Sequence, residues 1–519
     1  VNNPSSQTLS SAAPPPQGDE TVLTIGGEQL PANPLNPLTV QTADGGERTL
    51  RVDNATIEIW GGLVGAPDQA WVTAPAELLW HGVQVYVSAP AASTDPTILD
   101  AKRVRIAATP ALERISAPTF PALADAVNAN TFMALLGREN GPGIFLLEKS
   151  GTVQPLWADE NAANWLTGDV PGGILLRAPA TTTGRNSFSW VRTDGSALRL
   201  FAQPFYALNG VAGDAYGGVW WIETPQVALD QWQLWHYNPQ RQQAELQYQG
   251  NSSFFNQRGA GRDLAPLLLA VRPLWTDDAI SQVTFWVDTQ NSQAQAPNQG
   301  FFQFTLDTGN EGLATLQATP QVLLTADSYR APLQVSADFS QLAYLQYDPA
   351  RPSLTAGALK PANRVQLLRL ATLSATTRAA AQPLYAATAD TEFLAPDLTW
   401  AAADRLLAVR SRFSLGNNLD LARFGFVDLQ LPTSASGSAV ANNFLLPGRQ
   451  ELRGVAPCRA DQSYLMVVEN RSRQSTDTNN GTATPEVALE LVRWDRRNAP
   501  EPIFGLPAGL SQVLVCWQS

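Results

Sequence analysis

The sequence has 519 residues, of which 44% are hydrophobic and only 15% charged, and its formal net charge is −12. This length exceeds one ordinary globular core and predicts either several domains or a repeat fold. The acidic balance argues against nucleic-acid binding, which needs a basic surface, and against docking on anionic lipid. No run of about 18 apolar residues, which would predict a transmembrane helix, occurs in the sequence.

Residues 1–19 are rich in Ser, Ala, Pro and Gln and show no hydrophobic periodicity. This composition predicts a flexible, disordered tether. The chain starts at Val1 rather than Met, which favours an exported protein whose signal peptide has been removed, although an arbitrary starting point would look the same. We therefore expect a periplasmic, cell-surface or extracellular location, and leave open whether the tether carries a lipid anchor.

Residues 20–109 predict a small β unit. Apolar residues alternate at 56–60 and 83–88, and a hairpin turn is expected at Asp44-Gly45-Gly46. The predicted strands are 21–25, 38–42, 48–52, 56–60, 76–80, 83–88 and 101–107. The closing phrase LLWHGVQVYVSAP, followed by TILDAKRVRI, resembles small OB-like barrel domains of exported bacterial proteins. The resemblance implies either a structural spacer or a ligand-binding module.

From residue 110 onward the most legible pattern is a hairpin that occurs seven times. The predicted hairpins are 143–149 with 152–158, 187–193 with 196–201, 233–237 with 244–248, 301–306 with 313–318, 364–370 with 381–385, 422–430 with 441–446, and 487–494 with 501–504. A strong apolar strand precedes most of these hairpins. These strands are 131–138, 172–178, 217–223, 282–288, 341–348, 405–410 and 463–469.

Four strands repeated seven times indicate a β-propeller, with about 59 residues per repeat. The phrases PLQVSADFSQLAYLQYD, LTWAAADRLLAVR and APCRADQSYLMVV resemble the repeats of TolB-type, WD40-like bacterial propellers. Asp338, Asp404 and Asp461 hold the turn acid of that repeat, and the resemblance is clear only in these last three repeats. It implies an all-β protein: a seven-bladed β-propeller over 110–519, preceded by the small β-barrel and the tether. Six or eight blades remain open.

The C-terminal strand 512–517 is left over after the seventh hairpin. We predict that it supplies the innermost strand of the first blade and closes the ring. The only two cysteines, Cys458 and Cys516, hold matching places in the phrases LRGVAPCR and LSQVLVCW. A disulfide between neighbouring inner strands would reinforce the closure, and two buried free thiols are the alternative.

The sequence contains no motif that indicates catalysis. Its two histidines, His81 and His236, fall in different predicted domains, which argues against a zinc site or a Cys–His pair. A nucleophile elbow, a P-loop and a dinucleotide-binding glycine pattern are all absent. Segments 307–312 and 477–481 carry oxygen ligands but lack the spaced acids of a calcium loop, so we interpret them as turns. We expect no catalytic residue, metal or cofactor.

The segments that join the second and third strands lengthen in the later repeats. These segments are 289–300, 349–363, 411–421 and 471–485. Because binding residues often lie on loops held by a rigid scaffold, we predict a binding rim on this face of the propeller. Its candidate residues are Asp348, Arg351, Arg412, Arg471, Arg473 and Asp477. Tolerated insertion of long loops is the alternative.

Three functional hypotheses follow. The first is an exported, non-enzymatic binding or scaffold protein whose propeller face engages a protein or glycan partner at the cell envelope. The second is a propeller lyase or glycosidase that uses channel carboxylates, for which Asp125, Asp214 and Asp277 are the candidates. The third is a subunit of a larger extracellular or cell-surface assembly.

Overall fold

A computed structural model describes a large part of the chain. The described residues are 14–26, 37–60, 71–73, 79, 84–88, 95, 97–106, 115–116, 119–138, 143–157, 166–170, 173–178, 187–192, 195–202, 206–214, 216–225, 231–251, 266–276, 279–289, 300–308, 314–317, 321–325, 329–347, 362–370, 381–388, 392–413, 421–432, 437–447, 450–458, 461–470 and 488–516. Strands dominate these residues, and the described part of the chain contains one helix.

The N-terminal strands form one mixed sheet in the order β5-β4-β8-β6-β1-β2-β3-β7. Its strands are β1 (Thr21–Ile25), β2 (Leu38–Thr42), β3 (Glu47–Arg51), β4 (Thr56–Trp60), β5 (Trp71–Thr73), β6 (Gln84–Ser88), β7 (Ile98–Asp100) and β8 (Arg103–Ile106). Alternation buries Leu23, Val40, Val85 and Val104 in a single apolar core. The strand predicted at 76–80 falls almost wholly outside the described residues, and the OB-like resemblance stays a prediction.

The remaining described strands form seven antiparallel sheets, which we number along the chain. The first sheet contains β10 (Phe132–Arg138), β11 (Ile144–Glu148), β12 (Val153–Trp157) and β38 (Leu510–Cys516). The second contains β13 (Leu166–Val170), β14 (Gly173–Ala178), β15 (Ser187–Arg192), β16 (Ala197–Phe201) and, at its edge, β9 (Ile115–Ser116). The third contains β17 (Tyr206–Gly213), β18 (Val219–Pro225), β19 (Gln231–Asn238) and β20 (Gln243–Asn251).

The later sheets repeat the same order of strands. The fourth contains β21 (Leu267–Thr276), β22 (Ala279–Asp288), β23 (Gly300–Asp307), β24 (Thr315–Leu316) and β25 (Gln321–Thr325). The fifth contains β26 (Arg330–Val335), β27 (Gln341–Gln346), β28 (Arg364–Arg369) and β29 (Gln382–Ala386). The sixth contains β30 (Glu392–Ala402), β31 (Arg405–Phe413), β32 (Leu421–Gln430) and β33 (Val440–Leu445). The seventh contains β34 (Gln450–Pro457), β35 (Tyr464–Asn470), β36 (Ala488–Trp494) and β37 (Glu501–Leu506).

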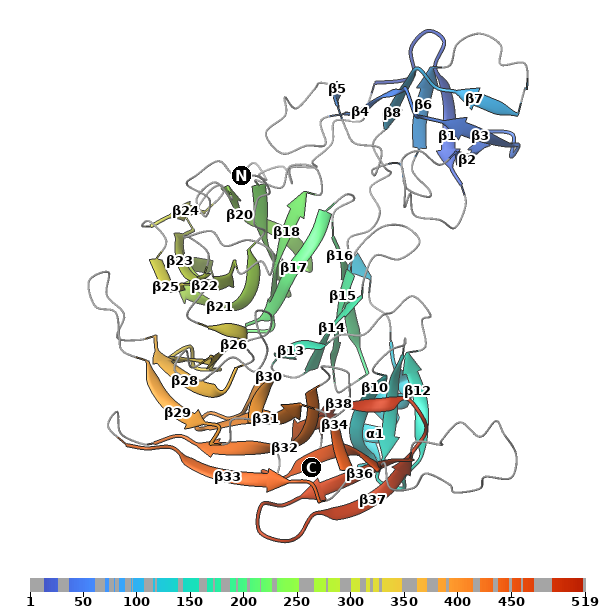
Figure 1. Cartoon of the computed structure of the whole chain (residues 1–519). Coiled ribbons are helices and arrows are strands. Elements are labelled where there is room, and N and C mark those ends of the chain that lie inside the picture. The colour runs from blue at the N-terminus through green and yellow to red at the C-terminus, as the bar shows by residue number, and fades with distance from the viewer. Residues whose placement is uncertain are drawn as a thin grey trace, which may run out of the picture.

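The seven sheets follow one another around a ring, and the N-terminal sheet lies to one side of it (Figure 1). Neighbouring sheets meet face to face and bury mixed cores. One such core joins Trp220 and Leu234 of the third sheet to Phe285 and Phe304 of the fourth. Full burial of large apolar side chains on both faces is what a stack of radial sheets requires. The prediction of an all-β protein of the β-propeller type is confirmed.

The C-terminal strand joins the two ends of the repeat. β38 pairs antiparallel with β10 of the first sheet and also contacts β34, the first strand of the seventh sheet. The strand predicted at 512–517 is therefore Leu510–Cys516, and its pairing with the first sheet is as predicted. The N-terminal repeat is thus completed by residues from the other end of the chain.

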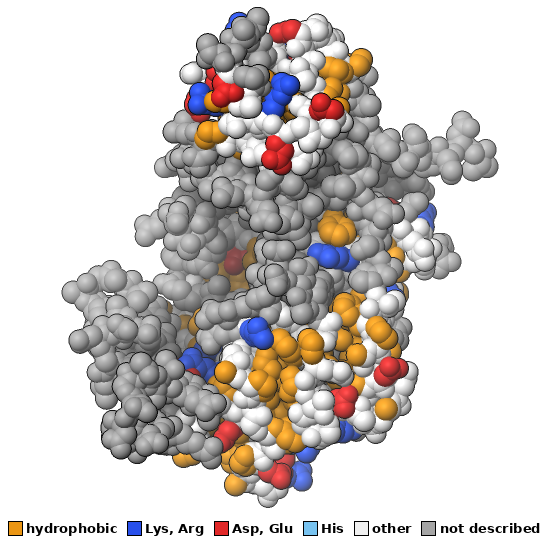
Figure 2. All heavy atoms as spheres, turned by 90° about the vertical axis from the view of Figure 1, so that its right-hand side faces the viewer, with side chains coloured by type: hydrophobic (Ala, Val, Ile, Leu, Met, Phe, Trp, Pro, Cys, Tyr) orange, Lys and Arg blue, Asp and Glu red, His pale blue; other side chains and the backbone are white. Residues whose placement is uncertain are grey.

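The helix α1 (Pro121–Asn128) was not predicted from the sequence. Its buried Leu123 and Ala126 pack against residues of both the first and the second sheet, including Leu146 and Val191. Proline at the first turn and the apolar spacing of this helix are the local signals for it. Viewed from the right-hand side of Figure 1, hydrophobic side chains gather over the lower surface, where the first sheet and α1 lie (Figure 2).

Candidate functional site

The structure describes only one of the six predicted rim residues. Asp348, Arg351, Arg471, Arg473 and Asp477 lie outside the described residues. Arg412 was predicted to lie on a loop, and this is wrong, because β31 continues to Phe413. Arg412 is the second-to-last residue of β31 and is exposed. It lies at the end of the sixth sheet where the second strand leads to the third.

One side of the sixth sheet carries a connected set of charged and aromatic groups, which we call the arginine site: Glu392, Arg410, Arg412 and Phe424. The Arg410 Nε donates to Glu392 Oε1 at 2.5 Å, and both residues are buried. The guanidinium carbons of Arg410 and Arg412 lie 5.0 Å and 5.4 Å from the centroid of the Phe424 ring. Both arginines therefore pack on the same ring, where cation–π attraction holds them.

Local backbone geometry explains why Phe424 reaches these arginines. The pairing of β31 with β32 shifts register between Arg410 and Ser411, so that Phe424 is an extra residue on its strand. Such a bulge redirects a side chain that would otherwise face the opposite side of the sheet. The neighbouring Gly425 leaves room for the close approach of Phe444, whose carbonyl oxygen a Cβ there would clash with.

The two arginines differ in their ion pairs and hydrogen bonds. Arg410 is neutralised by Glu392 and also donates to Asn443 Oδ1 at 3.0 Å. Glu392 accepts a further hydrogen bond from the Tyr385 hydroxyl at 3.0 Å. Arg412 lies opposite Glu392 in the strand pairing, yet no ion pair joins it to any carboxylate among the described residues. Among the described residues, its guanidinium contacts an aromatic ring and no carboxylate, and the side chain is exposed.

The other side of the sixth sheet carries arginines that are already paired. Arg423 forms an ion pair with Asp397 at 3.1 Å and donates to the carbonyl oxygen of Arg453 on the seventh sheet. Arg453 in turn pairs with Glu451 at 3.5 Å and with Glu469. These contacts fix the seventh sheet against the sixth.

The candidate channel carboxylates do not form a catalytic pair in the described part of the structure. Asp125 is exposed on α1, Asp214 is buried in the turn after β17, and Asp277 lies outside the described residues. Asp214 accepts hydrogen bonds from the Tyr216 and Gly218 amides, both at 2.8 Å, and from the Trp220 indole at 2.8 Å. Its role is to hold a turn.

His236 belongs to the same structural cluster. Its Nε2 lies 3.8 Å from Asp214 Oδ2, its ring stacks on Trp220, and the side chain is fully buried. Burial lowers the pKa of His236 to about 4, although the Asp214 carboxylate acts in the opposite direction. The imidazole is therefore neutral near pH 7 and packed, as an isolated histidine among aromatic residues usually is. His81 lies outside the described residues.

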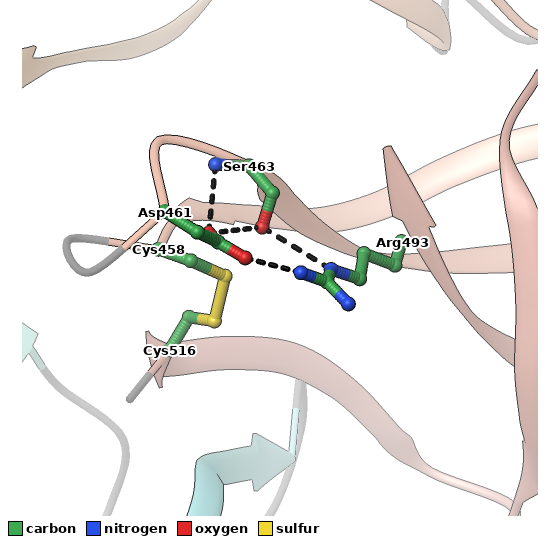
Figure 3. The surroundings of a disulfide bond; sticks show 5 residues. All are labelled: Cys458, Asp461, Ser463, Arg493 and Cys516. Carbon is green, nitrogen blue, oxygen red and sulfur yellow. Dashed lines mark hydrogen bonds and ion pairs between the residues drawn. A yellow bond between two sulfur atoms is a disulfide. The ribbon is translucent and has the colours of Figure 1, made fainter. Parts of the chain in front are cut away.

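The aspartates that match the turn acid of the TolB-type repeat also have structural roles. Asp461 accepts from the amide and hydroxyl of Ser463 and forms an ion pair with Arg493 (Figure 3). Asp404 accepts from Gln430 at 2.5 Å. In each case the carboxylate lies in the turn between the first and second strands of a sheet and bonds with a residue at the end of the third strand. Next to this turn in the seventh sheet, Cys458 and Cys516 form a disulfide with a Cα–Cα distance of 4.8 Å (Figure 3).

The described residues contain no cluster of three or more potential metal ligands and no helix suited to crossing a bilayer. The sequence analysis missed Phe424, Arg410 and the paired arginines. The phrase AVRSRF places Arg410 and Arg412 two residues apart on a strand, hence on one face, and this spacing was the available signal.

Comparisons with known proteins identify no relative by sequence: no family model and no curated protein matches the chain. Among solved structures, a putative 6-phosphogluconolactonase from Bacteroides fragilis aligns with 73% of this chain and 96% of its own, at 12% identity and a TM-score of 0.40. A post-proline cleaving enzyme from Rickettsia typhi aligns over 74% of this chain and 55% of its own, at 10% identity and a TM-score of 0.37.

A polysaccharide lyase described as an ulvan lyase aligns over 60% of this chain and 72% of its own, at 11% identity and a TM-score of 0.34. This chain therefore spans about half the length of the second of these proteins and most of the other two. At such identities and scores the similarities carry no argument about activity. The functional argument depends on the residues of this chain alone.

Proposed function

We propose that this protein is an exported, non-enzymatic binding protein that holds a protein or glycan partner of the cell envelope at the arginine site. The observation that carries this proposal is Arg412. Its guanidinium is exposed, lacks an ion pair among the described residues, and is held on Phe424. A planar guanidinium fixed in this way can form two parallel hydrogen bonds with a carboxylate or sulfate group.

The support behind Arg412 favours recognition over chance exposure. Arg410 also packs on the Phe424 ring and forms an ion pair with Glu392. The ring is therefore held in place by a buried residue of the protein itself. A side chain ordered before binding loses less conformational entropy when the partner arrives.

The disulfide supports the proposed export. Disulfides persist in oxidising compartments and are rare in the cytosol. The two cysteines of the sequence are buried and joined to each other, which is the arrangement expected of a structural cross-link in the periplasm or outside the cell. A role as a subunit of a larger surface assembly remains a hypothesis that depends on the identity of the partner.

The proposal is tested by affinity capture from envelope and medium extracts of the native host, followed by measurement of the dissociation constant for the purified partner. Arg412→Gln is expected to weaken binding about ten-fold, which corresponds to about 1.4 kcal/mol. Arg497→Gln is the matched control, because Arg497 is also exposed. It lies in the seventh sheet, in the turn between the third and fourth strands, which is at the opposite end of a sheet from the connection near Arg412. Equal affinity of Arg412→Gln and the wild type would contradict the proposal.

A further inference from the structure

The outer strand of the sixth sheet, β33, differs from the outer strands of the other sheets. A free strand edge attracts further strands, and proteins protect such edges with proline, charge, short length or a covering segment. The other sheets use these devices: proline in β12, β29 and β37, a charged residue in β20, a covering strand on β16, and division into two short segments in the fourth sheet. β33 (Val440–Leu445) contains neither proline nor charge, and no described strand pairs with its outer edge.

The register of β33 determines which backbone groups face the open edge. The Leu446 amide donates to the carbonyl oxygen of Phe424 at 2.9 Å, and the pairing with β32 continues along the strand without a register shift. In an antiparallel pair, alternate residues bond to the neighbouring strand, and the residues between them turn their N–H and C=O groups away from it. The backbone groups of Ala441, Asn443 and Leu445 therefore point to the open edge.

The side chains along this edge are exposed and uncharged. Val440 is 60% exposed and Leu445 is 54% exposed, and Ala441 and Asn443 are exposed as well. The whole segment 431–448 contains no charged residue. A further strand would therefore pair with β33 without removing a charge from water, and it would cover apolar side chains.

The outward-facing backbone groups of β33 are complementary to those of a second β33. With a two-fold axis through Asn443, the two strands run antiparallel, and Ala441 of each copy faces Leu445 of the other. Each facing pair exchanges two hydrogen bonds, so the three pairs would form about six. An axis through Leu445 would instead place Asn443 opposite Pro447, which has no N–H to donate.

The side chains match in the same register. Residues that face each other in an antiparallel pair lie on the same side of the sheet. On one side, Leu445 would pack against Ala441 of the other copy, and the two Asn443 side chains would meet. On the other side, Val440 would lie opposite Leu446. Each exposed apolar residue thus gains an apolar neighbour and no like charges meet, which favours a second copy of this chain as the occupant.

The size of the contact sets the strength of the association. A pair of six-residue strands buries on the order of a few hundred Å² on each copy, whereas a stable interface needs about 800 Å² from each partner. The association is therefore expected to be weak, with a dissociation constant on the order of 100 μM. β33 lies at the outer rim of the ring, where a second copy reaches it from outside (Figure 1).

We propose that two copies of this protein associate edge to edge through β33, so that their sixth sheets form one continuous sheet of eight strands. This pairing does not depend on the proposed function. A two-fold axis perpendicular to the sheet would leave the arginine sites of both copies on the same side of the joined sheet. If the arginine site binds as proposed, a partner with repeated anionic groups would be held at two points, which raises its avidity.

The test is sedimentation velocity of the whole protein from about 1 μM to about 1 mM, over which the wild type should change from monomer to dimer. In Ala441→Lys/Leu445→Lys, the introduced positive charges face each other across the axis, and the dimer should be at least about ten-fold weaker. In Ala441→Glu/Leu445→Lys, opposite charges face each other, and the dissociation constant should stay within about three-fold of the wild type and rise with salt.

Two control variants keep the open edge of β33 intact. Leu316→Lys also places a charge at an exposed leucine, which is 37% exposed on β24 of the fourth sheet, and it should dimerise like the wild type. Arg412→Gln should also leave dimerisation unchanged, so that failure of the dimer and failure of binding at the arginine site are distinguishable. Near-ultraviolet circular dichroism establishes that each variant keeps its fold.

Three outcomes would overturn the proposal. The first is a wild type that stays monomeric at the highest concentration, and this includes the case in which β33 captures a different protein. The second is a double-lysine variant that dimerises as strongly as the wild type, which would place the dimer contact on another surface. The third is equal weakening of the dimer in both double variants, which would exclude a register in which positions 441 and 445 face each other.

Discussion

Removal of the disulfide is expected to loosen the closure of the ring. Cys516 ends β38, the strand that completes the first sheet from the C-terminal side of the chain, and Cys458 directly follows β34 of the seventh sheet. In the double variant Cys458→Ser/Cys516→Ser, β38 keeps its pairing with β10 and the burial of Leu510. It loses the covalent link that holds its far end in place.

The size of the effect follows from the length of the closed loop. The two cysteines are 58 residues apart, so the cross-link constrains an unfolded loop that corresponds to the seventh sheet. Loop-closure entropy for that length contributes about 4 kcal/mol at 25 °C. This free energy is expected to be lost as joint opening of β38 and of the strands of the seventh sheet that lie within the closed loop.

Hydrogen exchange followed by mass spectrometry measures this opening directly. Amides of 510–516 and of 132–138 are expected to exchange up to about a thousand-fold faster in the double variant, since about 1.4 kcal/mol corresponds to a factor of ten. Reduced wild-type protein is the control for the substitutions themselves and should behave in the same way. Exchange within a factor of two of the oxidised wild type, in both samples, would refute the assignment of the disulfide to ring closure.

Three further variants test the packing account. The fully buried carboxylate of Asp428 pairs with two arginines, and Asp428→Ala leaves their charges uncompensated. Denaturant unfolding should therefore show that the free energy of unfolding falls by about 3–5 kcal/mol. Asp404→Ala, at an exposed position, should lower it far less. Gly250→Ala would force a methyl group against a buried indole, and its melting curve should show a loss of about 1–3 kcal/mol. Folding lowers the pKa of His236 to about 4, so the unfolded state binds a proton at a higher pH than the folded state does. As the pH falls from about 6.5 to about 4, the free energy of unfolding should therefore decrease by up to about 3 kcal/mol. His236→Asn should remove that part of the pH dependence.

The strand order of the propeller could be predicted because its signals are local. In the fifth sheet, Asp338 accepts from the hydroxyls of Ser336 and Ser340 and from the Ser340 amide, all within the turn 336–340. A turn that depends on its own residues leaves a pattern in the sequence wherever it recurs. The turn acid marks the last three repeats, the first four were assigned from the spacing of their strands, and the closing strand was the one left over after the seventh hairpin.

The fourth sheet shows where local signals were insufficient. The outer strand was predicted at 313–318, but β24 covers only Thr315–Leu316, and β25 pairs with the remainder of β23. The outer edge is therefore divided between two short segments. Which segment pairs with which half of β23 depends on tertiary contacts, and the sequence pattern does not encode that choice.

The arginine site was predicted only in part, for a similar reason. Arg412 could be placed near the correct end of a repeat from the length of the following segment. Its support by Phe424 depends on a register shift opposite Arg410, which in turn depends on the packing of Gly425 against Phe444. The cluster of Asp214 and His236 likewise joins residues of different strands through their pairing. Contacts of this kind appear only when the sheets are assembled.

Site-specific photo-crosslinking tests the central proposal most directly. Ala422 lies opposite Arg412 in the strand pairing, and Val440 is 60% exposed on the outer strand of the same sheet. With p-benzoylphenylalanine at each position in turn, irradiation in host envelope extract is expected to give a defined adduct with a host partner from position 422, absent from position 440 and lost in combination with Arg412→Gln. An adduct with a host partner from position 440 alone, or one from position 422 that survives Arg412→Gln, would contradict binding at the arginine site.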